Sequence, residues 1–179
     1  MKQETKNRIS ASVADFHLPR YNEIPNVGLY LEQTSKYISE YLAPLGEYGL
    51  TNSMISNYVK KGLVANPVKK QYDREQIVYL FFIAVAKTVL SLDALTGFID
   101  LQKRTYSLEK AYDFFCRQFE GMLQYTFELT DTIEAVDSDT TVDTEQAMGK
   151  RLLFSCIVAV TQKIYLEKSL EAIASEIKE

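Results

Sequence analysis

The feature that most constrains this chain is a run of ten uncharged, almost wholly apolar residues, Ile77 to Ala86, which Lys87 closes. A helix that crosses a membrane needs about 20 such residues, so this run has about half the necessary length. It predicts instead a helix that is buried in a globular core. With 179 residues, of which 46% are hydrophobic, the chain can bury one substantial core, or a small domain beside a larger helical one.

The segment near the N-terminus predicts an extended arm. Residues 13–26 contain Pro19 and Pro25 and show no helical period, and proline disfavours the helical conformation in the residue before it. We expect the arm to lie over the domain. Its anchors should be Phe16, Leu18 and Tyr21.

Two helices are predicted between this arm and the apolar run. From Val27, hydrophobic residues recur every three or four positions, which predicts an amphipathic helix that ends at Pro44. Thr51 then offers an N-cap hydroxyl, and Gly62 offers the left-handed residue at which helices commonly end. Residues 52–61 should therefore form a short helix.

A basic turn separates this short helix from the apolar run. Residues 66–72 are too few and too polar for a core element, and they predict a wing. Asp73 and Gln76 have the spacing of a capping box, in which each side chain accepts a hydrogen bond from the backbone N–H of the other residue. The helix that holds the apolar run should begin there and continue to about Leu90.

The C-terminal half is also predicted to be helical, and strand signals are nearly absent. Helices over 93–104 and 107–129 should precede an acidic loop over 131–144 and a last helix that continues to about residue 178.

The last helix carries two apolar stripes whose phase differs by two residues, one over 153–164 and one over 166–177. A coiled coil needs one sustained stripe. The change of face predicts a helix that is packed in a bundle or broken near Tyr165.

Positive charge is concentrated in one short segment. Residues 51–74 hold five basic residues against Asp73 alone, a net charge of +4, although the whole chain carries −4 and its remainder therefore −8. Clustered basic side chains release counterions from phosphates, and an acidic remainder limits indiscriminate binding. We predict that this cluster contacts DNA phosphate; the alternative is a solvated lysine face. Its members are Lys60, Lys61, Lys69, Lys70 and Arg74.

The predicted helix 52–61 has an inward and an outward face. Ile55, Val59 and Leu63 recur at a spacing of four and should pack inward. Asparagine can pair with adenine, and serine can donate or accept, in the major groove. The residues that we predict to contact bases are Asn52, Ser53, Ser56 and Asn57. Tyr58 should lie at the rim, where its hydroxyl reaches phosphate or its ring is half-buried.

These residues carry a resemblance to a known family. The stretch TNSMISNYVKKGL over 51–63, followed by YDREQI over 72–77, resembles the DNA-binding domain of MerR-type regulators. The resemblance covers about residues 27–102 and implies a winged helix-turn-helix. It implies a capped recognition helix that ends at Gly62, a wing that ends at Tyr72, and a second capped helix.

The chain departs from that family at two points and resembles a second family more closely. Ser56 and Asn57 stand where MerR proteins usually carry Arg and Tyr, and the wing is short. With LPRY at 18–21, EIPN at 23–26 and GLYL at 28–31, the whole chain resembles a bacterial family, domain of unknown function 1836. That family is MerR-like and has no assigned function.

We therefore predict an all-α protein that acts as a MerR-like transcriptional regulator bound to double-stranded DNA. An N-terminal arm over 1–26 precedes a winged helix-turn-helix module over 27–104, with helix 52–61 in the major groove and wing 68–72 on phosphate. A helical bundle over 105–179 should form a homodimer or receive a signal. The alternative is a protein-interaction adaptor that has lost DNA binding and docks a partner through its apolar helices.

Enzyme chemistry finds little support in the sequence. The chain has one histidine, His17, and neither an HExxH nor a GxGxxG motif, so we expect no catalytic site, metal or cofactor. Cys116 and Cys156 form no CxxC pair and should be buried thiols. Because the N-terminus has no secretory signal, we expect a cytoplasmic protein that does not bind membranes.

The C-terminal half is rich in aromatic residues. Core packing is their default explanation. The sharper hypothesis is that some of them line a pocket for an apolar small-molecule effector. The set consists of Tyr106, Tyr112, Phe114, Phe115, Phe119, Tyr125 and Phe127.

Overall fold

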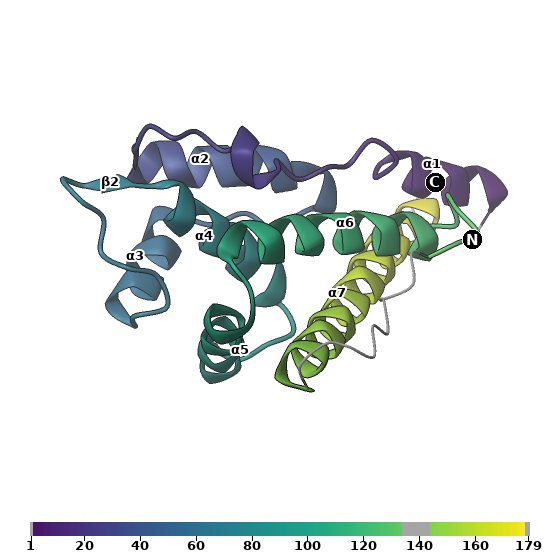
Figure 1. Ribbon diagram of the computed structural model, residues 1–179. Coiled ribbons are helices and arrows are strands. Elements are labelled where there is room, and N and C mark those ends of the chain that lie inside the picture. Colours follow the sequence, from purple (N-terminus) through teal and green to yellow (C-terminus); the bar gives the residue numbers. More distant parts are fainter. Residues whose placement is uncertain (1, 134–143, 178–179) are drawn as a thin grey trace.

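The computed structural model describes residues 2–133 and 144–177, and it confirms a mostly helical protein (Figure 1). In chain order the elements are α1 (Gln3–Ala11), the 3-10 turn η1 (Tyr21–Glu23), β1 (Leu29–Tyr30), α2 (Leu31–Leu42), the 3-10 turn η2 (Ala43–Leu45), α3 (Asn52–Lys60), β2 (Gln71–Tyr72), α4 (Arg74–Ala86), α5 (Leu92–Thr105), α6 (Leu108–Thr126) and α7 (Thr144–Glu176).

The helices form an elongated molecule with different elements at its two ends. Figure 1 shows α6 running along its middle, with α3 and β2 at one end and α1 with the last turns of α7 at the other. The helix α7 packs against α1, α4, α5 and α6. The N-terminal and C-terminal helices therefore share one core with the segment that we predicted to bind DNA.

The apolar run lies at the centre of this core. The helix α4 packs against α2, α6 and α7, and the side chains of Ile77, Leu80, Phe81 and Ile83 are fully buried. Because α4 is covered on several sides, its sequence is apolar all round rather than amphipathic. The helix ends at Ala86, before the predicted Leu90.

Two short strands were not predicted. The strands β1 and β2 are antiparallel, with Leu29 opposite Tyr72 and Tyr30 opposite Gln71. The start at Val27 that we predicted for the first amphipathic helix was wrong, because this pairing takes up residues 29–30 and α2 begins at Leu31.

The N-terminal segment has a helix that its polar sequence did not indicate. The Thr5 hydroxyl of α1 donates a hydrogen bond to the Glu176 carboxylate near the end of α7. The arm that follows is anchored by Phe16 and Leu18, which are buried as predicted. A charged contact that we did not predict also holds the arm, because the guanidinium of Arg20 pairs with the carboxylate of Glu120.

The helix α7 is continuous from Thr144 to Glu176, so the predicted break near Tyr165 was wrong. The alternative prediction, a helix packed in a bundle, is confirmed for the first apolar stripe. Its buried residues are Leu153, Ile157, Val160 and Ile164. The second stripe faces outward. Most of the predicted acidic loop 131–144 lies outside the described residues.

Candidate nucleic-acid interface

The helix α3 begins and ends as its sequence predicted. The Thr51 hydroxyl accepts a hydrogen bond from the Met54 amide at 3.2 Å, which caps the N-terminus. At the other end, Gly62 has a φ of +78°, and the amides of Leu63 and Gly62 donate to the carbonyls of Tyr58 and Val59. These two bonds form a Schellman motif, which fixes where the helix stops.

The exposed face of α3 carries short polar side chains. Ile55 is buried and Val59 is half-buried, as we predicted for the inward face. Asn52 is half-buried, whereas Ser53, Ser56 and Asn57 are exposed. Within the described part of the chain, none of these four side chains makes a hydrogen bond. Their donors and acceptors are therefore available to a partner.

The predicted wing is a two-residue hairpin turn. Val68 and Gln71 exchange both backbone hydrogen bonds, at 3.0 and 2.9 Å, and the turn residues Lys69 and Lys70 have φ values of +50° and +66°. Positive φ at both positions is the pattern of a type I′ turn, which glycine and asparagine usually occupy. Two lysines are therefore held in a costly conformation, and both side chains are exposed.

Contacts on both sides fix the hairpin to the rest of the protein. Tyr72 is buried, and the backbone at Gly28 passes so close to Gln71 that a Cβ on Gly28 would lie 2.7 Å from the Gln71 Cβ. Asp73 and Gln76 form the predicted capping box, and the Gln76 amide also donates to the Ala65 carbonyl at 2.8 Å. The hairpin thus has a fixed position relative to α3 and α4.

Arg74 does not join the exposed lysines. Its guanidinium lies 5.3 Å from the centre of the Tyr21 ring and donates to the Ile24 carbonyl at 2.9 Å. It also contacts the Asn22 amide oxygen at 3.4 Å. These contacts to the arm compete with the predicted phosphate contact. The sequence could not indicate them, because they join residues about 50 positions apart.

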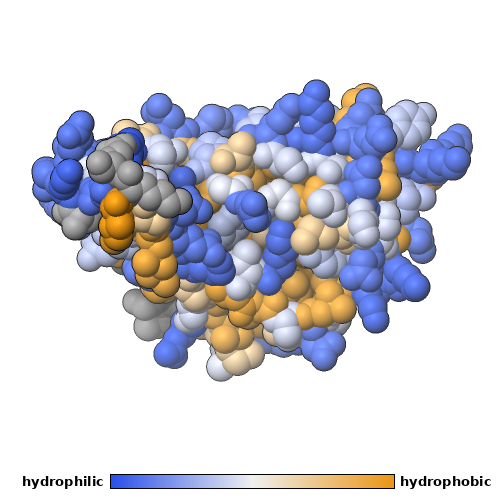
Figure 2. Space-filling view, turned by 180° about the vertical axis from the view of Figure 1, so that it is seen from behind, coloured by the Kyte–Doolittle hydropathy of each residue, from blue (hydrophilic) through white to orange (hydrophobic). Residues whose placement is uncertain are grey.

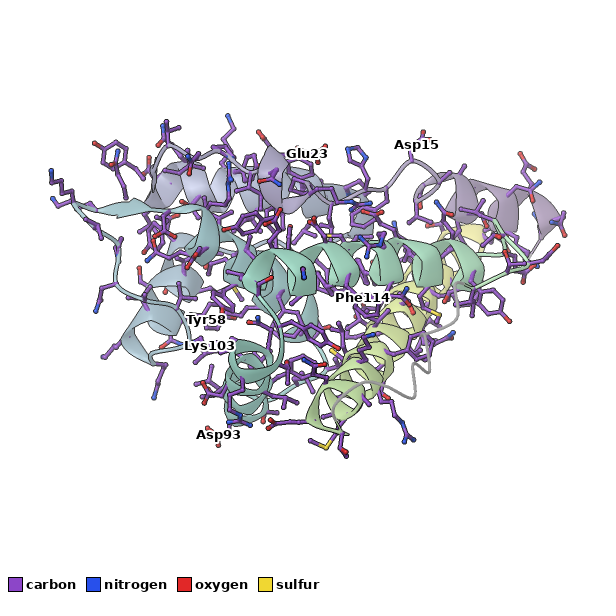
Figure 3. The ribbon with its side chains drawn as sticks, in the orientation of Figure 1. Asp15, Glu23, Tyr58, Asp93, Lys103 and Phe114 are labelled. Atoms are coloured by element: carbon purple, nitrogen blue, oxygen red, sulfur yellow. The ribbon has the colours of Figure 1, made fainter. Side chains whose placement is uncertain are left out.

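Of the two positions predicted for Tyr58, the structure favours the half-buried ring over the rim, and the ring is buried more completely than predicted. Its side chain is only 7% exposed, and Figure 3 shows it on the side of α3 that faces the rest of the molecule. Burial raises the pKa of its hydroxyl. This location fits a core residue better than a phosphate ligand.

The other lysines of the predicted cluster lie at the end of α3. Lys60 is the last residue of the helix, Lys61 follows it, and both are exposed. Among the described residues, none of Lys60, Lys61, Lys69 and Lys70 forms an ion pair. Four of the six predicted phosphate ligands, all but Tyr58 and Arg74, therefore have no described ion-pair partner that would compete with an anion.

The described residues give no candidate metal site. No group of three or more His, Cys, Asp or Glu side chains within 2–133 and 144–177 could hold a metal ion. In the same ranges, no helix is both long and apolar enough to cross a membrane.

Comparison with known proteins gives one match. A family model described as Domain of unknown function (DUF1836) matches residues 19–115, more than half of the chain. No curated protein matches the chain, and no solved structure does.

Proposed function

The chain belongs to this family, whose description assigns no activity, and we propose from the geometry of α3 that it is a DNA-binding transcriptional regulator. The observation that carries the proposal is the exposed face of α3. This face is capped at its start, bears serine and asparagine without partners among the described residues, and ends at two exposed lysines. Polar faces of this kind near a helix N-terminus suit the major groove.

The roles of the individual residues follow from their chemistry. Asn52, Ser53, Ser56 and Asn57 contact base edges, because asparagine and serine can both donate and accept there. The phosphate ligands are Lys60, Lys61, Lys69 and Lys70. Phosphate contacts set position and affinity, whereas base contacts set sequence preference.

The order of the elements supports the finer assignment to a MerR-like winged helix-turn-helix. A capped helix ends at a left-handed glycine, a short basic hairpin follows, and a second capped helix carries the apolar core. This is the order that the MerR resemblance implies. The hairpin turn at Lys69 and Lys70 corresponds to the wing.

We also propose that α7 holds two copies of the chain together. Its outer face carries an uncharged stripe at intervals of three or four residues, and Leu166 and Leu170 on it are each 57% exposed. The stripe has large residues at both ends and small or polar ones between. It consists of Met148, Leu152, Ser155, Ala159, Gln162, Leu166, Leu170, Ile173 and Ile177.

An antiparallel pair of α7 helices would match this stripe to itself. Stripe members the same number of steps before and after Gln162 along the stripe would meet, so the large Leu166 of each copy would face the small Ala159 of the other. A symmetric dimer would present two copies of α3 to two half-sites.

The exposed stripe also favours one alternative. A protein-interaction adaptor that has lost DNA binding would dock an apolar partner on α7. Its binding would not involve the exposed lysines around α3. Apolar docking responds little to salt, whereas phosphate contact responds strongly, so the two functions can be separated by experiment.

The experiment measures binding to labelled DNA fragments by fluorescence anisotropy at low salt. The double variant Lys69→Glu, Lys70→Glu should bind all sequences more weakly by more than about tenfold, because two phosphate contacts become repulsive. The control is Lys2→Glu, Arg8→Glu, which makes the same charge change on and beside α1 at the other end of the molecule (Figure 1). Equal losses of affinity in both variants would mean that only the net charge of the protein matters. That result would overturn the assignment of the hairpin lysines to phosphate contact.

The variant Asn57→Ala separates the two roles within the same assay. DNA sequences selected by the native protein should lose their advantage over random DNA, by roughly five- to a hundredfold, while binding to random DNA persists. A uniform loss in Asn57→Ala and in the lysine variant alike would contradict the division into base and phosphate contacts.

A further inference from the structure

A cleft opens between the end of α5, the start of α6 and the first turns of α7. Its volume is about 580 Å³, which is within the range of sites for small organic molecules. Tyr106, Phe114 and Lys150 line it together with the apolar side chains of Phe98, Leu101 and Leu153. The space is therefore amphipathic, with aromatic and cationic groups facing hydrophobic ones.

The cationic groups of the cleft are not neutralised by the described residues. The Lys150 ammonium lies 5.9 Å from the centre of the Tyr106 ring and 5.7 Å from that of Phe114. In ranges 2–133 and 144–177, no carboxylate forms an ion pair with Lys150, Lys110 or Arg117, which all line the cleft. Aromatic faces stabilise an ammonium only weakly, so Lys150 can still bind an anion.

The acidic residues of the lining are engaged with the arm. Glu109 accepts a hydrogen bond from the Asn22 side chain at 2.8 Å, and Asp113 accepts one from the Tyr21 amide at 2.8 Å. These two carboxylates therefore have partners outside the cleft. Three basic groups remain beside them, so the described lining residues carry a net positive charge.

A second, narrow cavity of about 50 Å³ lies beside the cleft. The two share Phe98, Gln102, Ala111 and Leu153, and the narrow cavity is almost wholly apolar. An apolar cavity of this size can accept a small hydrocarbon group. An occupant of the cleft could thus extend an apolar part toward α4 while its polar end stays at Lys150.

We propose that this cleft binds a small organic anion, with a carboxylate or sulfonate at Lys150 and an aromatic or aliphatic body against Phe98, Leu101 and Leu153. Figure 3 shows Phe114 between α6 and α7, where it would flank that body. Figure 2 shows hydrophobic side chains along the lower edge of the back face, where α5 and the first turns of α7 lie in Figure 1. This binding does not depend on DNA binding, and it is tested on the protein alone.

The test uses two fluorescent probes of nearly the same shape. Anilinonaphthalene sulfonate carries a sulfonate, whereas phenylnaphthylamine is neutral, so the pair isolates the effect of the charge. The 179-residue chain should bind the sulfonate at one site per chain, and Lys150→Gln should weaken that binding by about tenfold or more. The neutral probe should bind more weakly and should not respond to Lys150→Gln.

Two controls keep the result specific to the cleft. Lys103→Gln removes a lysine that also lies over an aromatic ring, at 5.6 Å from Tyr79, but does not line the cleft. This variant should bind the sulfonate like the native protein, and Arg117→Gln should weaken binding as Lys150→Gln does. The proposal is overturned if the sulfonate does not bind, if Lys150→Gln leaves its affinity unchanged, or if both lysine variants lose it equally.

Discussion

The two cysteines lie inside the core and should be unreactive. Burial raises the pKa of the Cys116 thiol to about 12 and that of Cys156 to about 11. Because only the thiolate is nucleophilic, we expect iodoacetamide to label the native protein at pH 8 more slowly than the unfolded chain by more than about a hundredfold. Labelling followed by mass spectrometry measures both rates. Rapid labelling of either native cysteine would contradict its place in the core.

The same burial predicts how alkaline pH acts on stability. In the unfolded chain a cysteine loses its proton near its ordinary pKa of 9.0, whereas the native thiols keep theirs until higher pH. The unfolded state then binds fewer protons than the native state. Stability should therefore fall as the pH rises above about 9.

Local chemistry explains which single residues could be assigned from the sequence. The caps at Thr51 and Asp73 and the left-handed Gly62 depend on neighbours within five positions, and all three were predicted correctly. The contacts of Arg74 and the burial of Tyr58 could not be assigned in this way, because they depend on the arm and on the core. Charge and amphipathic character alone do not reveal such surroundings.

The outer stripe of the helix α7 leads to a prediction about the oligomeric state. If its outer stripe joins two copies, the double variant Leu166→Glu, Leu170→Glu should convert a dimer into a monomer, since four charges would meet in an apolar seam. Light scattering after gel filtration measures the mass. Val27→Glu is the matched control, because Val27 is also exposed but lies before β1, away from α7. A native protein that elutes as a monomer would contradict the proposed dimer.

The boundaries of an element could be predicted only where the residues of that element determine them by themselves. The helix α4 carries an uninterrupted apolar run and its own capping box, and α5 and α6 are amphipathic, so the predicted ranges lie within a few residues of the observed ones. The strands β1 and β2 are two residues each and exist only because segments about 40 positions apart pair. The second stripe of α7 was visible in the sequence, but only the fold shows that nothing among the described residues covers it.

The arm connects the two ends of the molecule. Asn22 donates to Glu109, which lines the cleft, and accepts from Arg74, which begins α4 beside the hairpin. The proposed anion site and the proposed DNA-binding face are therefore joined through one short segment. The sequence indicated an extended arm, but the ion pair of Arg20 with Glu120 and the contacts of Asn22 depend on the whole fold.

DNA recognition through α3 and the hairpin should make binding steeply dependent on salt, which titrations at several salt concentrations measure. With Lys60, Lys61, Lys69 and Lys70 on phosphates, the logarithm of the association constant should fall against the logarithm of the salt concentration with a slope of about −3.6 per chain. The variant Lys69→Glu, Lys70→Glu should have a slope less steep by about two. A slope near zero, or no binding to DNA even at low salt, would contradict DNA recognition through α3 and the hairpin and would favour the adaptor.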